Sequence, residues 1–306
     1  MIPSFRTDAA VPLPSLAHER GCRCALHQRR LFTGLLVAGA AVPAWSQTQE
    51  GVRDDVGKTS KWTKLVPAEQ VEQAAATQYT QMTREAAQQR ALAPANHPQV
   101  VRLRAIAERL IPYTLPWNSR ARGWKWEVNL IGSKELNAFC MPGGKIAFYH
   151  GILQQLQLSD AEVATIMGHE MAHALREHAR ERMGKTAATR LGANLFSSLL
   201  GLGSTGDALL GAGATLLTLK FSREDESEAD IVGMELAARA GYDPAAGITL
   251  WQKMMKASAG APPQFMSTHP AGESRIQDIQ AKLPKVDGLY ARADKPSREF
   301  SPPARS

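Results

Sequence analysis

A His-Glu-x-x-His sequence at residues 169–173 brings together three side chains that can bind a metal or carry a proton. Ser159, with Glu162 three residues later, forms a capping-box pattern that predicts the start of a helix before them. Residues four apart lie on one face of a helix, so the two histidines can bind the same zinc ion. Glu170 then stands beside them as a general base for water at the metal. The spacing therefore predicts a zinc site on a helix over residues 161–183.

A third ligand is needed, because a catalytic zinc normally has three protein ligands and one water. One extended pattern continues with a glycine and a third histidine, but Arg176 and Ala179 occupy those positions. The other common arrangement takes a glutamate from a separate helix, and the acidic segment 222–230 supplies Glu226. Asp230 lies four residues further on, where it can accept a hydrogen bond from a ligand histidine. A solvated helix start would also explain acidic residues here, but not the apolar residues that follow directly.

Taken in order, these segments resemble the HtpX and Oma-type family of zinc metallopeptidases, of which the CAAX prenyl proteases are distant members. The resemblance covers about residues 100–283 and includes three further motifs: Asn137-Ala138-Phe139, Pro142 to Ile146, and Ser267 to Pro270 with Arg275.

The resemblance assigns the zinc ligands to His169, His173 and Glu226, with one zinc ion per chain. It assigns the role of base to Glu170, and places Asp230 behind a ligand histidine. It also implies a zincin-like core of the gluzincin type.

A small sheet is predicted just before the zinc helix. Apolar residues alternate over residues 124–131, and segments 136–141 and 145–149 flank a Pro-Gly-Gly turn typical of a hairpin. The expected fold is α+β and mainly helical, with a small antiparallel sheet against the zinc-binding helix. In zinc peptidases of this kind an edge strand binds the substrate backbone. By resemblance Asn137 and Ala138 lie on that edge; the alternative is that they are ordinary strand residues.

His269 lies on a predicted loop before a proline, with Arg275 close behind it. His269 has three possible roles: a donor to the oxyanion of the reaction, a fourth zinc ligand that keeps the enzyme latent, or a surface residue. Arg275 can stabilise the same oxyanion or pair with Asp230. His178 follows His173 by five residues and would point about 140° away from it on a continuous helix. We interpret His178 as an outer contact of the site or a surface residue.

Residues 1–46 have the features of a cleaved export signal. Two arginines at 29–30 precede an apolar run at 31–44, and a small-x-small site ends at Ser46. The run is shorter than the roughly 20 residues that span a membrane, although an uncleaved anchor is the alternative. The arginine pair also resembles a twin-arginine signal, without deciding between that route and general secretion. We therefore expect a periplasmic protein, with membrane association as a further possibility.

The remaining chain divides into three expected parts. Residues 47–96 are expected to form a linker and an N-terminal helix, 97–284 the zinc peptidase domain, and 285–306 a disordered tail, with the last helix at 271–283. The apolar, Gly-rich segment 184–219 has two interpretations: short helices packed on the core, or a hairpin in peripheral contact with a membrane.

Charge and cysteine content exclude some alternatives. Residues 1–46 hold part of the net charge of +7, and the modest remainder gives no reason to expect nucleic acid binding. Cys140 is the one cysteine beyond the signal, so no internal disulfide is expected, and its apolar surroundings predict a buried thiol.

The sequence therefore predicts an exported zinc endopeptidase. By resemblance, its substrates are unfolded or misassembled envelope proteins. The main alternative is a zinc-containing, chaperone-like binding protein that is latent or inactive as a protease, and a third interpretation is a scaffold at the membrane surface.

Overall fold

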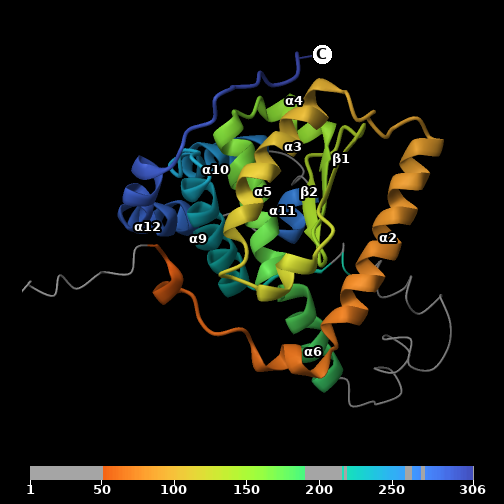
Figure 1. Ribbon diagram of the computed structural model, residues 1–306, viewed down its shortest axis with the longest axis vertical. Helices are drawn as coiled ribbons and strands as arrows, with labels where there is room; N and C mark the ends of the chain where they lie inside the picture. Colours follow the sequence, from red (N-terminus) through yellow and green to blue (C-terminus); the bar gives the residue numbers. More distant parts are fainter. Residues whose placement is uncertain (1–50, 190–215, 217–218, 259–263, 270–272, 306) are drawn as a thin grey trace, which may run out of the picture. The chain divides into compact units, whose positions relative to one another are not determined.

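The computed structural model describes residues 51–189, 216, 219–258, 264–269 and 273–305. The predicted export signal and most of segment 184–219 lie outside these residues. Within the described part, no helix is long and apolar enough to cross a bilayer. The elements, drawn in Figure 1, are η1 Arg53–Asp55, η2 Lys61–Leu65, α2 Ala68–Gln88, α3 Pro98–Leu110, η3 Ile111–Tyr113, η4 Ser119–Gly123, β1 Glu127–Ile131, β2 Ala138–Met141, β3 Lys145–Tyr149, α4 His150–Leu156, α5 Asp160–Leu175, α6 His178–Thr189, α9 Arg223–Arg239, α10 Ala246–Ala257, α11 Gln264–Thr268 and α12 Glu273–Arg292.

Helix α5 is the central element, and nearly all of its side chains are buried. Its predicted capping box is confirmed: the Ser159 hydroxyl accepts from the Glu162 N–H, and the Glu162 carboxylate accepts from the Ser159 N–H. A cap of this kind contributes about 1 kcal/mol to stability. Arg102 of α3 is fully buried and donates to the Asp160 carboxylate in the first turn. The start of the helix is therefore fixed in place.

The predicted single helix over 161–183 is in fact two helices. Helix α5 ends at Leu175, Glu177 takes a left-handed conformation with φ 60°, and α6 begins at His178. A non-glycine residue in this conformation is uncommon, and no glycine or proline marks the break. Arg180, one turn into α6, pairs with the Glu177 carboxylate and helps to hold it. The prediction of a continuous helix was wrong because the break leaves no residue-type signal.

The sheet is mixed, which corrects the expectation of an antiparallel sheet. Strands β2 and β3 form the predicted antiparallel hairpin, but β1 runs parallel to β3, in the order β1-β3-β2. Strand β3 lies in the middle because four of its five residues are buried. A hairpin pattern identifies consecutive partners only, so it does not show on which side of the hairpin an earlier strand will add. Strand β2 is left as an edge.

Helices cover both faces of this sheet (Figure 1). Helices α3 and α5 pack on one face, where Val128, Ile146 and Phe148 join the main core. Helix α2 packs on the other face, where Tyr79 is buried and donates a hydrogen bond from its hydroxyl to the Ile146 carbonyl. Edge strand β2 is thereby held directly against the helix that carries residues 169–173.

Helix α9 packs closely along α5, and this contact depends on two glycines. A Cβ added to Gly168 would lie 2.8 Å from the Gly233 carbonyl oxygen, and a Cβ on Gly233 would lie 2.6 Å from the His169 nitrogen. Ser222 starts α9 with a second capping box, formed with Asp225. The following residue, Glu226, is therefore fixed in the first turn, opposite α5.

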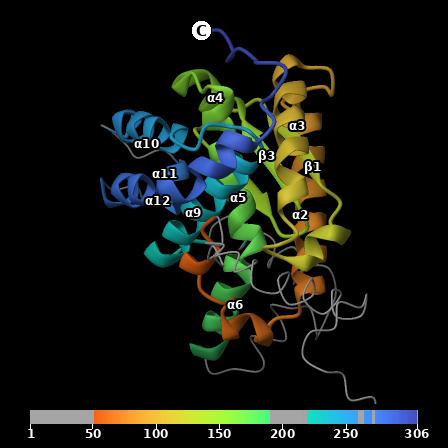
Figure 2. The ribbon, with the colours of Figure 1, turned by 60° about the vertical axis from the view of Figure 1, so that its left-hand side comes forward.

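Helix α12 extends past its predicted end at Leu283 and past Pro284, so the expectation of a disordered tail from residue 285 was wrong. Proline removes one helical hydrogen bond, but Val286 and Leu289 are buried in the main core one turn further on. Figure 2 shows α12 beside α10. Beyond the helix, the Phe300 N–H donates to the Asp160 carboxylate, so the last described residues contact the start of α5.

The N-terminal segment 51–66 is bound to three helices, α9, α12 and α6. The Val52 N–H donates to the buried Glu235 of α9, and Asp55 pairs with Lys282 and Lys285 of α12. Arg180 of α6 donates to the carbonyl of Val66 at the end of the segment. The predicted linker over these residues is thus an ordered part of the domain.

Candidate metal centre

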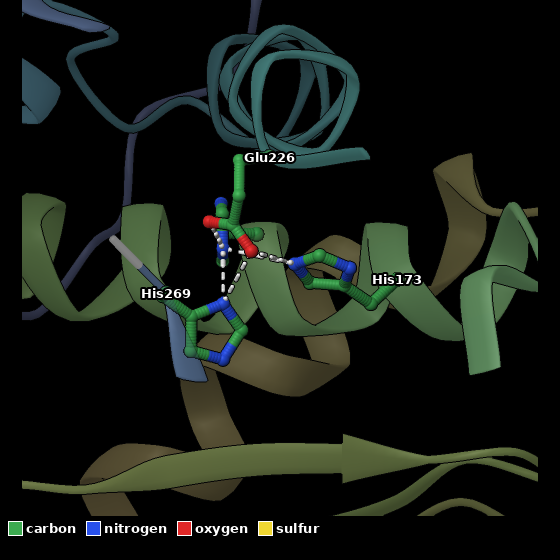
Figure 3. A group of neighbouring side chains, drawn as sticks. His173, Glu226 and His269 are labelled. Carbon is green, nitrogen blue, oxygen red and sulfur yellow. Dashed lines mark hydrogen bonds and ion pairs between the residues drawn. The ribbon is translucent and has the colours of Figure 1, made fainter. Parts of the chain in front are cut away.

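Four side chains, from α5, α9 and the residue that follows α11, converge in one buried cluster: His169, His173, Glu226 and His269. Figure 3 shows His173, Glu226 and His269 pointing toward one another. One ligand atom from each lies within 4.8 Å of all the others. The Nε2 atoms of His169 and His173 are 3.1 Å apart, and each lies 3.5 Å from a different oxygen of Glu226: Oε2 faces His169 and Oε1 faces His173. The structure therefore brings together the three residues that the resemblance assigns as ligands, and adds His269 to them.

The chemistry of this cluster fits zinc. Imidazole nitrogens and carboxylate oxygens are its usual ligands, and four of them around one point match its tetrahedral preference. Glu170 gives independent support: its Oε1 atom is buried without a hydrogen-bond partner among the described residues, facing His269 Nε2 at 3.5 Å. A buried carboxylate oxygen without a partner is costly unless water or an ion stands near it. The residues present can therefore hold a zinc ion, with Glu170 beside it.

Asp230 and Arg275 hold the first histidine from behind. His169 donates from Nδ1 to the Asp230 carboxylate at 3.0 Å, and Arg275 donates to both oxygens of Asp230 at 2.6 Å. Arg275 also pairs with Glu226 at 2.8 Å, and its guanidinium lies 3.7 Å from the ring centre of Trp251. Arg275 thus makes the pair with Asp230 that the sequence offered as one of its two roles.

Burial and neighbouring charges together shift the pKa values of Glu170, His269 and Asp230. Burial raises the pKa of Glu170, against the opposing effect of His269 and His169. Burial alone would lower the pKa of His269, but the carboxylates of Glu170 and Glu226 outweigh it and raise this pKa. Arg275 holds the pKa of Asp230 at about 2 in spite of burial, with help from the His169 hydrogen bond. Asp230 therefore remains an acceptor over the physiological range.

The second histidine has a partner that the sequence interpretation left open. His173 Nδ1 lies 2.9 Å from Nδ1 of His178, which is 1% exposed. The break at Glu177 turns His178 back toward His173, so the surface alternative for His178 is wrong. Phe221 stacks on His173 with ring centroids 4.0 Å apart. No spacing rule signals Phe221 or Trp251, because both come from distant elements and are recognised only by contact.

A cavity of about 310 Å³ opens beside the cluster, between α5 and edge strand β2. Glu170, His173 and His269 line it, as do the predicted substrate-binding residues Asn137 and Ala138. Glu135, Tyr149 and Thr268 add polar groups to the lining. The other lining residues are apolar: Phe139, Cys140, Met141, Pro142, Ala174, Ala179, Leu216, Leu219 and Phe221.

The edge strand presents backbone groups near this cavity. The Tyr149 N–H donates to the Asn137 carbonyl, so by the alternation of an antiparallel pair the N–H and C=O of Ala138 point away from β3. The Ala138 N–H donates to the Asn137 side-chain oxygen at 2.9 Å. Cys140 on the same strand is buried, as predicted, and burial raises the pKa of its thiol well above the usual range.

Residues 97–283, from α3 into α12, match the peptidase family M48. The chain belongs to this family. The match includes all four residues of the cluster and Glu170, and it leaves α2 and segment 51–66 in front of the M48 region.

Curated relatives agree with this M48 assignment. The chain is 39% identical to the mitochondrial metalloendopeptidase OMA1 of Arabidopsis thaliana over 161 residues, which are 51% of this chain and 31% of that protein. It is 30% identical to the metalloprotease LoiP of Escherichia coli over 200 residues, 65% of this chain and 75% of LoiP. It is also 30% identical to the beta-barrel assembly-enhancing protease of E. coli, over 54% of this chain and 36% of that protein. The M48 chain thus spans only part of most of these relatives.

Proposed function

We propose that this chain is a zinc-dependent endopeptidase that hydrolyses peptide bonds in unfolded or misassembled envelope proteins. The observation that carries the proposal is the buried ligand cluster with Glu170 beside it, opening onto a cavity along an edge strand. A purely structural zinc site needs neither a base nor such a cavity. The relatives named as metalloendopeptidase, metalloprotease and assembly-enhancing protease support the activity and the class of substrate.

In the proposed mechanism His169, His173 and Glu226 would hold the zinc ion. Zinc bound there would polarise the scissile carbonyl and lower the pKa of a water molecule toward about 7. Glu170 takes the proton of the attacking water and delivers it to the leaving amine. Burial of Glu170, which raises its pKa, suits a group that must both accept and release a proton near neutral pH.

Substrate binding is proposed to use the edge of β2. An extended peptide can add to an open strand edge through main-chain hydrogen bonds, which tolerate many sequences. The outward N–H of Ala138 is such a donor, and the Asn137 amide that covers it would move to let the peptide in. The apolar wall of the cavity suits the apolar side chains that unfolded proteins expose. These features favour a protease that acts on unfolded chains.

The position of His269 favours the latent alternative over a surface role. Its Nδ1 atom lies 3.2 Å from His169 Nε2 and 3.0 Å from Glu226, and its side chain is buried. A catalytic zinc needs a free fourth position for water, so His269 must leave the cluster before substrate is cleaved. We therefore propose a resting enzyme that His269 holds closed. The chaperone-like alternative corresponds to a His269 that never leaves.

One experiment separates these cases. Mature wild-type protein, Glu170→Gln and His269→Ala are compared for degradation of unfolded casein, with zinc content measured for each. Glu108→Gln, on an exposed position of α3, is the matched control. We expect cleavage by wild type and Glu108→Gln, none by Glu170→Gln at equal zinc, and faster cleavage by His269→Ala. Zinc-loaded protein that cleaves in no variant would instead support the chaperone-like function.

Export to the periplasm is proposed from residues 1–46 alone. Replacing Arg29 and Arg30 together by lysine, followed by fractionation of the producing cells, tests the route. Loss of export with the lysine pair supports the twin-arginine route, and unchanged export supports general secretion. Membrane contact through 184–219 is tested separately, by partition of the mature protein into detergent.

A further inference from the structure

A line of three polar side chains runs away from the metal cluster behind His173. The His173 and His178 rings meet edge to face, with their Nδ1 atoms 2.9 Å apart. On the far side of His178, Nε2 lies 3.6 Å from an oxygen of Glu228, which belongs to α9. Glu228 is also paired with Arg176, whose guanidinium donates to the carbonyl of Gly57 in the N-terminal segment.

The protons on this line can be assigned by elimination. Nε2 of His173 faces the cluster, so it must be the ligand atom and its proton must lie on Nδ1. That proton is donated to Nδ1 of His178, which must therefore be unprotonated. The N–H of His178 then lies on Nε2, the atom that faces Glu228. This arrangement makes the His173–His178 contact a hydrogen bond and turns the second N–H of His178 toward Glu228, at an ion-pair distance of 3.6 Å that is longer than a hydrogen bond.

We propose that His178 is a positioning residue, which orients the ligand His173 and is itself oriented by Glu228. The proposal rests on the proposed function only in that the cluster binds zinc. A ligand imidazole normally donates its second N–H to an acceptor that fixes its tautomer and ring angle. For His169 that acceptor is Asp230; for His173 the only acceptor found among the described residues is His178.

The electrostatics explain why a histidine stands here rather than another carboxylate. The cluster already includes the buried carboxylates of Glu170, Glu226 and Asp230, beside the single guanidinium of Arg275. A further carboxylate in contact with His173 would add an uncompensated buried charge. His178 orients His173 without placing a negative charge against it. The negative charge is on Glu228, whose side chain is 24% exposed and paired with Arg176.

The backbone is shaped for this contact. On an unbroken helix His178 would point about 140° away from His173. The left-handed conformation of Glu177 ends α5 and redirects the chain, at a cost in free energy for a non-glycine residue. The turn places the buried imidazole of His178 against His173, and this contact can offset the free energy that the left-handed conformation costs.

Three substitutions of His178 test the proposal. Asparagine puts an acceptor oxygen where Nδ1 stands and keeps the contact with His173. Glutamine puts its polar group where Nε2 stands, facing Glu228, and leucine removes both contacts. The dissociation constant for zinc is measured by competition with a chromophoric chelator, for each variant in a Glu170→Gln background that prevents self-digestion. Far-ultraviolet circular dichroism of the zinc-free proteins checks that each one folds.

We expect His178→Leu and His178→Gln to weaken zinc binding by about 10- to 100-fold, the usual effect of losing a partner behind a ligand. His178→Asn should bind close to wild type. Equal zinc affinity in all three variants would overturn the positioning role, as would an asparagine variant that folds but binds as weakly as leucine. A parent protein that binds no zinc would instead refute the metal site, and with it the proposed function.

Discussion

Gly168 and Gly233 face each other where α5 and α9 cross, one residue before the first histidine of the cluster. Neither position has room for a methyl group, because the Cβ of either would lie under 3.0 Å from backbone atoms of the other helix. The same crossing sets the separation between His169 and Glu226. Two residues that carry no functional group therefore fix the spacing of two that do.

Replacing Gly233 by alanine should push the two helices apart. Overpacking of this kind costs about 1–3 kcal/mol, and it should weaken zinc binding because Glu226 moves with α9. Denaturant unfolding of the zinc-free protein and chelator competition measure the two effects. Gly247→Ala is the matched control: its Cβ would meet its nearest neighbours at 3.5 Å or more, an ordinary contact. Equal behaviour of the two variants would contradict this account of the crossing.

Trp251 should stabilise the metal site through Arg275, which pairs with Glu226 and Asp230. Its ring lies under the Arg275 guanidinium at 3.7 Å, and that contact should be worth about 1–2 kcal/mol at a desolvated position. Trp251→Leu should therefore lower both the unfolding midpoint and the affinity for zinc. Trp251→Phe should retain most of both, since the indole Nε1 makes no hydrogen bond within the described structure. A phenylalanine variant as impaired as leucine would show that size, and not the aromatic face, is what matters.

The ion pairs of Asp55 with Lys282 and Lys285 should make a pH-dependent contribution to the stability of the domain. Hydrogen bonds from Lys282 and Lys285 lower its pKa below the usual 3.8. A carboxyl whose pKa is lower in the folded state stabilises the protein above its unfolded pKa, and this contribution disappears as the pH falls through the folded value. We expect wild type to exceed Asp55→Asn by about 1 kcal/mol or less at pH 7, since the pair is partly exposed. The difference should disappear as the pH falls below 3.8 and through the lowered pKa of folded Asp55, when unfolding is followed in urea; a difference that stays constant with pH would contradict the linkage.

Asn137 should matter for substrate affinity more than for turnover. If its amide binds the peptide after leaving the Ala138 N–H, Asn137→Ala removes a hydrogen bond worth about 1 kcal/mol. KM for an unfolded substrate should then rise about fivefold with kcat nearly unchanged. Steady-state kinetics with an internally quenched peptide give both constants. A fall in KM would mean instead that the amide obstructs the edge.

Local signals in the sequence predicted much of the site. These signals are the capping box at Ser159 and the spacing of residues 169–173 and 222–230. Each depends on neighbours within one or two helical turns, so it can be predicted from the sequence. The convergence of His169, His173 and Glu226 in space followed from the resemblance, and the structure brings these residues together. The hairpin was predicted for the same reason, since its turn lies between its strands.

Contacts between elements far apart in the chain could not be predicted from the sequence. The left-handed Glu177, the parallel pairing of β1 and the passage of α12 through Pro284 all depend on packing with other parts of the chain. The place of His178 follows from the first of these, and helical spacing alone pointed it the wrong way. His269 had three open roles because a loop residue has no periodicity that fixes where it points.

The bond between Asp55 and Lys285 joins residues 230 positions apart, and the contact between His169 and His269 spans 100. Synthesis proceeds from the N-terminus, so α5 leaves the ribosome before α9, which carries Glu226, and before His269. These contacts join residues far apart in the sequence, and such contacts generally form slowly. A zinc ion can be held at full affinity only after the last helix has docked, since binding and folding share one free energy. Under the proposed function, the compartment in which the chain finishes folding would therefore also have to supply the zinc ion.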